Sequence, residues 1–184
     1  MKLLSRLLLL CLFGNAFSQA IVENTAIGIT GNSIGLIRLG MQAEKILNFA
    51  KPISDKLEEM DEGELIRVMR INQNGISLGL FFEKNKVTRI SIYDRGLMTA
   101  NGIEVGTSLV NLLVIQDLKG GIGNKGLVVF SPSLCGRSFV LGVESEIDSY
   151  YPSIDDDTPQ EWTIQMLSKL PKNLVVKEIF VYGC

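Results

Sequence analysis

Acidic side chains gather in one stretch of this chain in a pattern suited to binding a metal ion. Glu144, Glu146 and Asp148 alternate along a segment that we expect to be extended, so they would share one face, and Asp155 and Asp157 follow a short loop later. Carboxylate oxygens are the ligands that Ca²⁺ prefers, and Ca²⁺ is abundant outside the cytoplasm. The same residues also fit a solvated acidic loop, because aspartates are favoured just before a helix N-terminus. Both interpretations stay open.

A glycine-rich hexapeptide, GIGNKG at residues 121–126, matches the pattern G-x-G-x-x-G of dinucleotide-binding folds. In those folds the motif follows a strand and opens a helix, whose N-terminus meets the phosphate. Here it follows a predicted helix and opens a predicted strand. We therefore expect a flexible loop and, Ca²⁺ aside, no cofactor.

The composition argues against catalysis. The chain contains no histidine, so a general acid or base would have to be a carboxylate, a lysine or a tyrosine. Ser-x-x-Lys does not occur, and no zinc-ligand motif is present. We predict that the protein is not an enzyme and has no catalytic residues.

Cys135 and Cys184 predict a disulfide that joins the last residue to an interior turn. Such bonds form in oxidising compartments. A catalytic role for either thiol would need a base to generate the thiolate, and no histidine is available.

Aromatic residues suggest where a partner could bind. Tyr150, Tyr151 and Trp162 lie in or beside the acidic region and could form a partner-binding edge. The alternative is that they simply pack over a sheet.

Residues 1–20 have the order of a secretory signal peptide: Lys2 and Arg6, an apolar run at 7–13, and small residues from Ala16. Cys11 suggests a lipoprotein, but Leu10 stands where a small residue should precede the modified cysteine. Removing this segment takes away two positive charges, so the formal net charge changes from −2 to −4. The mildly acidic remainder argues against nucleic acid as a partner. We predict an exported protein, periplasmic or secreted, without a later membrane-spanning segment.

An internal similarity organises the rest of the chain. Residues 37–47 align without gaps on residues 103–113, and each copy passes through a glycine, Gly40 or Gly106, into a short helix. Antiparallel strands follow each copy. They are predicted at residues 65–71, 76–83, 86–93, 127–131, 139–144 and 174–182, with turns at 74–75, 84–85 and 135–136.

Two insertions distinguish the halves. Residues 51–63 predict a second helix that begins near Pro52 and ends near Gly63. Residues 159–170 predict a helix that starts after the capping residue Thr158 and buries Trp162 and Leu167 on one face.

The glycine motif with its short helix and antiparallel meander, occurring twice, resembles the tandem-repeat fold of the β-lactamase-inhibitor-protein family. It also resembles the related small lipoprotein domain of the outer-membrane barrel-assembly machinery. The residues that carry the resemblance are Leu39-Gly40-Met41 with Ile46 and Leu47, and Val105-Gly106-Thr107-Ser108 with Leu112 and Leu113. The resemblance implies non-catalytic protein binding across the open face of a sheet, with no contact residues transferable from so short a motif.

Together these observations predict an α+β protein of two divergent repeats, with the helices packed on one face of the sheet. The predicted organisation is a signal peptide at 1–20, a first repeat at 21–100 and a second at 101–184. The sheet is either continuous or divided between two docked halves. The predicted function is protein or envelope binding, and the alternative is small-ligand or Ca²⁺ binding by residues 144–157.

Overall fold

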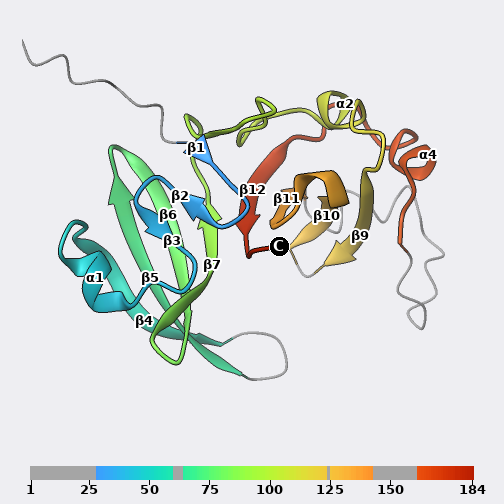
Figure 1. Ribbon diagram of the computed structural model, residues 1–184. Coiled ribbons are helices and arrows are strands. Elements are labelled where there is room, and N and C mark those ends of the chain that lie inside the picture. Colours follow the sequence, from blue (N-terminus) through green and yellow to red (C-terminus); the bar gives the residue numbers. More distant parts are fainter. Residues whose placement is uncertain (1–27, 60–63, 124, 143–160) are drawn as a thin grey trace, which may run out of the picture.

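The computed structural model describes residues 28–59, 64–123, 125–142 and 161–184. Strands dominate these residues (Figure 1). The helices are short: α1 spans Ala43–Leu47, α2 spans Leu109–Leu112 and α4 spans Ile164–Leu167. The predicted α+β class with helices packed on one face of the sheet is therefore wrong. Helices of four or five residues are too short to cover a large sheet, and other elements share that role.

An eight-stranded antiparallel sheet forms the body of the protein, in the order β4-β5-β6-β7-β12-β11-β10-β9. The junction between β7 and β12 pairs Ile92 with Ile179 and Val181 with Ile90, so the sheet is continuous. The strands are β4 (Pro52–Glu59), β5 (Leu65–Gln73), β6 (Ile76–Glu83), β7 (Lys86–Ile92), β9 (Lys119–Gly123), β10 (Gly126–Phe130), β11 (Arg137–Leu141) and β12 (Val176–Val181).

Two tight hairpins in this sheet agree with the sequence prediction. Asn74 and Gly75 join β5 to β6 with φ values of 55° and 85°. Lys84 and Asn85 join β6 to β7 with φ values of 47° and 65°. Positive φ at both central positions is the geometry that matches the twist of paired strands, and asparagine and glycine adopt it readily.

The helix predicted at residues 51–63 is wrong, because β4 occupies most of this segment. The run Ser-Asp-Lys-Leu-Glu-Glu has good helix formers, but local preference yields here to strand pairing. β4 pairs with β5 from Pro52 to Glu59, and Arg67 of β5 donates two hydrogen bonds to Asp55, at 2.8 and 2.6 Å. Without β4, the edge of β5 would be left unpaired.

The flexible loop predicted for residues 121–126 is also wrong in part. Gly121 and Gly123 belong to β9, which pairs with β10 in a hairpin. Gly126 has a φ of 116° and lies directly against the carbonyl of Gly142. The glycines thus allow close backbone approach within a sheet, and the segment opens no helix.

The two glycine motifs bond to the sheet in the same way. The N–H of Gly40 donates to the carbonyl of Val87 at 2.7 Å, and the N–H of Val87 donates to Met41 at 3.0 Å. The N–H of Gly106 donates to Val176 at 2.7 Å, and the N–H of Val176 donates to Thr107 at 2.9 Å. Each motif therefore anchors its short helix to one of the two central strands.

A small second sheet covers part of the large one, in the order β3-β2-β1-β8. Its strands have two residues each: β1 (Gly28–Ile29), β2 (Ser33–Ile34), β3 (Ile37–Arg38) and β8 (Met98–Thr99). Figure 1 shows β2 and β3 lying in front of β5 to β7. Ile29, Ile34 and Ile37 are buried in one core with the side chains of the large sheet. We call the covered side of the large sheet its inner face.

The last helix begins later than predicted. Trp162 pairs in extended conformation with Gly120, and α4 starts only at Ile164, with the Thr163 side chain accepting from the N–H of Met166. The proposed start at 158–159 lies outside the described residues. Leu167 and Leu170 are buried as expected.

Candidate binding face

The opposite side of the large sheet, which we call the open face, carries polar and aromatic side chains. Several of them are buried all the same, among them Val68, Phe81 and Glu178, which are 0 %, 4 % and 6 % exposed. Residues directly opposite each other in an antiparallel sheet share a face. One row runs through Arg70, Gly79, Ser91, Phe180 and Ser138. We define the open face by the side chains of Lys56, Glu58, Val68, Arg70, Phe81, Arg89, Tyr93, Lys125, Ser138, Val140, Glu178 and Phe180.

An arginine lies between two phenylalanine rings at the centre of this face. The guanidinium carbon of Arg89 is 3.8 Å from the ring centroid of Phe81 and 5.1 Å from that of Phe180. The three residues come from β6, β7 and β12, so the contact crosses the junction between the two halves of the sheet. Cation–π contacts of this kind are worth about 0.5–2 kcal/mol and hold the guanidinium in a defined orientation.

A lysine and a glutamate extend this cluster. The Nζ atom of Lys125 lies 5.3 Å from the Phe180 ring centroid and 3.0 Å from a carboxylate oxygen of Glu178. The Glu178 side chain is only 8 % exposed, whereas that of Lys125 is 49 % exposed. A carboxylate that is buried this far needs a charged partner. Lys125 supplies that partner and presents the rest of its charge to solvent.

Tyr93 lies flat across the sheet because β6 has a glycine beneath it. A Cβ atom on Gly79 would stand 2.9 Å from the Tyr93 hydroxyl. Burial raises the pKa of the Tyr93 phenol above its ordinary value, and the nearby Glu178 carboxylate acts in the same direction. The guanidinium carbon of Arg70 is 5.6 Å from the Tyr93 ring centroid.

The outer end of the open face carries an ion-pair chain. Glu58 of β4 accepts from Arg70 at 3.3 Å and from Lys56 at 3.2 Å. The open face as defined holds four cations and two carboxylates, so its formal charge is +2 (4 minus 2). The whole chain has a formal net charge of −2. Three of the four cations, Lys56, Arg70 and Lys125, are in ion pairs with these two carboxylates.

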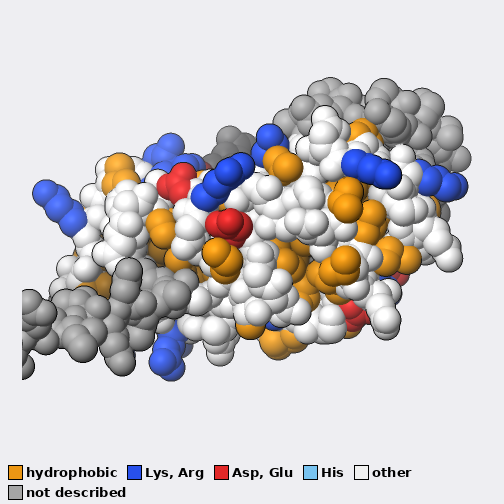
Figure 2. Space-filling model, turned by 90° about the horizontal axis from the view of Figure 1, so that it is seen from above, with side chains coloured by type: hydrophobic (Ala, Val, Ile, Leu, Met, Phe, Trp, Pro, Cys, Tyr) orange, Lys and Arg blue, Asp and Glu red, His pale blue; other side chains and the backbone are white. Residues whose placement is uncertain are grey.

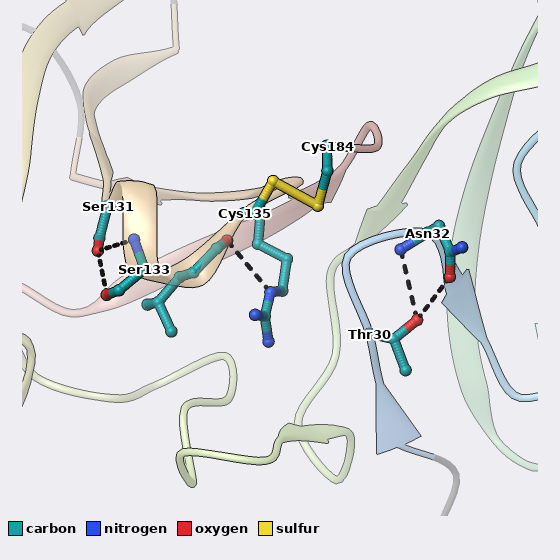
Figure 3. Close-up of a disulfide and its surroundings, with 8 residues drawn as sticks. Thr30, Asn32, Ser131, Ser133, Cys135 and Cys184 are labelled. Carbon is teal, nitrogen blue, oxygen red and sulfur yellow. Dashed lines mark hydrogen bonds between the residues drawn. A yellow bond between two sulfur atoms is a disulfide. The ribbon is translucent and has the colours of Figure 1, made fainter.

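The predicted disulfide between Cys135 and Cys184 is confirmed, with the two Cα atoms 5.1 Å apart. Figure 3 shows it beside the turn that contains Thr30 and Asn32. Gly31 of that turn accepts a hydrogen bond from the N–H of Gly183 at 3.0 Å. The disulfide therefore holds the C-terminus against η2 (Pro132–Leu134), and the hydrogen bond from Gly183 to Gly31 holds it against the loop between β1 and β2 of the small sheet.

Two serines next to the disulfide bind a carboxylate. Asp117 accepts hydrogen bonds from the Ser131 hydroxyl, from the Ser133 hydroxyl at 2.8 Å and from the Ser133 N–H at 2.8 Å. The Ser131 bond is the main cause that lowers the pKa of Asp117 below its usual value. Asp117 and Ser131 thereby fix the start of η2.

Among the residues predicted to bind a partner or a metal ion, the structure describes Trp162 alone. Trp162 is 1 % exposed and belongs to the core, so it packs against its own protein instead of forming a partner-binding edge. Tyr150 and Tyr151, together with the predicted metal ligands, lie at 143–160, outside the described residues. Among the residues that the structure describes, no group of three or more potential metal ligands occurs. Within the same ranges, no helix has the length and hydropathy needed to cross a membrane.

A second surface feature is a polar hollow of about 470 Å³ between β7 and α2. Arg95 and Asn101 line it together with the glycine motif around Gly106, and the Arg95 guanidinium rests against Gly106.

Figure 2 looks down on the end of the molecule that carries α2 in Figure 1. It shows hydrophobic side chains reaching the surface, most of them in the half that contains α2.

Sequence reasoning did not identify the residues of the open face. Phe81, Arg89 and Phe180 each occupy an ordinary alternating position in a strand, and only the pairing of β7 with β12 brings them together. A search for aromatic and basic residues on the outward positions of predicted strands would have selected these residues as candidates, without placing them side by side.

No protein-family model and no curated protein sequence matches this chain. Among solved structures, the chain is similar to the crystal structure of the uncharacterised protein YfeY from Escherichia coli, with a TM-score of 0.56 and 13 % sequence identity. The match covers 84 % of this chain and 99 % of YfeY. At this identity the likeness shows a shared fold and nothing about activity.

Proposed function

We propose that this chain is an exported, non-catalytic binding protein, and that its open face binds the surface of another protein. The observation that carries the proposal is the stack of Phe81, Arg89 and Phe180 across β6, β7 and β12. Arginine and aromatic residues are the types that dominate binding energy at protein interfaces. Phe81 is only 4 % exposed, so the half-buried Arg89 and Phe180 are the parts of the stack that reach the surface. A rigid sheet holds them with little loss of conformational entropy on binding.

The charge of the face supports a partner with exposed carboxylates. The face has a formal charge of +2 although the chain as a whole is acidic. Complementary potentials steer the encounter of two proteins and disfavour partners of like charge. An acidic surface with apolar groups between its carboxylates matches both the arginine stack and the half-exposed charge of Lys125.

Export is supported by two observations that agree. The first 20 residues have the pattern of a signal peptide, and the Cys135–Cys184 disulfide is typical of proteins that fold in oxidising compartments. The resemblance to inhibitor-like repeats also implies binding across a sheet face. The alternative of Ca²⁺ binding depends on residues outside the described ranges and stays a prediction.

The first experiment is site-specific photo-crosslinking in the native host. A photoreactive phenylalanine analogue replaces Phe180 in one strain and Val114 in another. Val114 is 79 % exposed, follows α2 and lies outside the open face, so it is a matched control. We expect a crosslinked protein from position 180 that is absent from position 114.

The affinity of the identified partner then tests the mechanism. Arg89→Ala and Phe180→Ala should each weaken binding about 30-fold, the effect of losing about 2 kcal/mol at an interface hot spot. Arg38→Ala, an exposed arginine of β3, should leave the affinity unchanged. Thermal melting of each variant separates lost binding from lost folding. Unchanged affinity in both folded variants would refute the proposal.

A further inference from the structure

The polar hollow beside α2 lies where the chain that leaves β7 meets the second glycine motif. Arg95 and residues 101–107 come from the connection between β7 and α2, and Ser108 and Asn111 come from the start of α2. Its volume of about 470 Å³ is in the range of small-molecule sites, roughly 300–1,000 Å³. Most such sites are lined by apolar groups with a few polar ones. A lining as polar as this one therefore selects a ligand that is itself polar.

Four side chains of the lining are available to a ligand. In the part of the chain that the structure describes, Arg95, Asn101, Ser108 and Asn111 make no side-chain hydrogen bond or ion pair. The guanidinium offers several N–H donors, each amide offers two donors and an acceptor, and the hydroxyl offers both. Water occupies these groups unless a ligand replaces it, so much hydrogen-bonding capacity is concentrated in one place.

The backbone that carries these side chains is held in place by its own hydrogen bonds. The Thr107 hydroxyl accepts from the N–H of Glu104 at 2.9 Å, and the Glu104 carboxylate accepts from the N–H of Gly96 at 3.0 Å. The Thr99 hydroxyl accepts from the N–H of Ile103 at 3.1 Å. A site that is fixed before the ligand arrives loses little conformational entropy on binding.

The arginine distinguishes this glycine motif from the first one. A Cβ atom on Gly106 would stand 2.6 Å from the Nε atom of Arg95, so the guanidinium occupies the space beside the glycine. A Cβ atom on Gly40 would meet nothing within 4 Å among the described residues. Both glycines donate to the sheet in the same way. Arg95 is therefore not needed to anchor the motif.

The charges of the hollow balance. Among the residues that line it, Arg95 carries a positive charge and Glu104 a negative one. A phosphate or carboxylate would be attracted by the guanidinium and repelled by the carboxylate, and a cation would meet the reverse. The hollow therefore favours an uncharged ligand with many hydrogen-bonding groups.

We propose that this hollow binds a neutral saccharide. Each hydroxyl of a sugar both donates and accepts hydrogen bonds, so two neighbouring hydroxyls can pair with the N–H and C=O groups of one asparagine amide. The fixed fork of N–H groups on Arg95 can donate to two neighbouring sugar oxygens. A Cβ atom on Gly102 would meet no described protein atom within 4 Å, so a sugar ring can approach the backbone there.

Titration of the ¹⁵N-labelled protein, followed by two-dimensional NMR, tests this site. The probes are glucose, N-acetylglucosamine, cellobiose and N,N′-diacetylchitobiose, with sodium phosphate as the anionic comparison. Concentrations up to about 10 mM detect dissociation constants in the millimolar range. We expect saturable shifts of the amide signals between residues 95 and 111 with at least one sugar, and none with phosphate.

Two substitutions then test the assigned groups with the sugar that binds best. Arg95→Ala and Asn111→Ala should each weaken binding about tenfold, because each leaves sugar hydroxyls without a partner. Both residues are exposed, so the variants should fold, and circular dichroism checks this. Arg38→Ala, which removes the same group from β3, should leave the sugar affinity unchanged.

Three outcomes would overturn the proposal. The first is that no sugar produces a saturable shift between residues 95 and 111. The second is that phosphate shifts these signals and the sugars do not, which would make the hollow an anion site. The third is that Arg95→Ala and Asn111→Ala both fold and keep the wild-type affinity. The test does not depend on the open face, because no partner protein is present.

Discussion

Replacing both Cys135 and Cys184 by serine should lower the free energy of unfolding by about 4 kcal/mol. The two residues are 49 positions apart, and closing a loop of that length removes this much entropy, as free energy, from the unfolded chain. The folded state should change little. Val181 still pairs with Arg137, and the N–H of Tyr182 still donates to Gly136 at 3.0 Å, so the strands hold the chain ends together without the bond.

Urea unfolding followed by tryptophan fluorescence measures this loss. Trp162 is the only tryptophan and is buried, so its emission reports loss of the core. The midpoint of thermal unfolding should fall by about 8–16 °C for a chain of this size. The slope of the free energy against urea should rise, because an unfolded chain without the crosslink exposes more surface.

The control is the wild type measured under reducing conditions, which should behave like the double-serine variant. A difference of less than about 1 kcal/mol between the oxidised wild type and the double variant would refute the reasoning. It would mean that the unfolded chain is already restricted in this region, or that the folded state is strained by the bond.

Three further changes test other parts of the structure. Gly31→Ala would place a Cβ atom 2.5 Å from the Cys135 carbonyl oxygen, so urea unfolding should detect a loss of about 1–3 kcal/mol. The pKa of Tyr93 is raised in the folded state. Its contribution to the free energy of unfolding is therefore complete below the unfolded pKa of about 10 and is lost as the pH rises through the folded pKa. Tyr93→Phe should lose less stability than the wild type in alkali. The pKa of Asp117 is lowered in the folded state. Its contribution to the free energy of unfolding is therefore present above the unfolded pKa of about 3.9 and is lost as the pH falls through the folded pKa. Asp117→Asn should show a weaker decline of stability in acid than the wild type. Equal pH profiles for either variant and the wild type would contradict the corresponding assignment.

The amino-acid sequence by itself determined the features that depend on neighbouring residues. Asn74-Gly75 and Lys84-Asn85 specify tight turns through their own backbone preferences, so the β5–β6–β7 meander was predicted nearly residue for residue. The pairing of the two remaining cysteines needed only their number and the expected compartment.

Only the tertiary structure decided the rest. Residues 52–59 have helix-forming types but form a strand, because pairing with β5 outweighs a preference of a few tenths of a kcal/mol per residue. Trp162 was predicted to be buried on a helix face, but it is buried in an extended segment that pairs with Gly120, a contact that no local pattern indicates. The open face exists because β7 and β12 lie side by side, although paired residues such as Ser91 and Phe180 are 89 positions apart in the sequence (180 minus 91). Contacts between distant segments depend on the whole chain packing together, so they cannot be read from any short stretch of it.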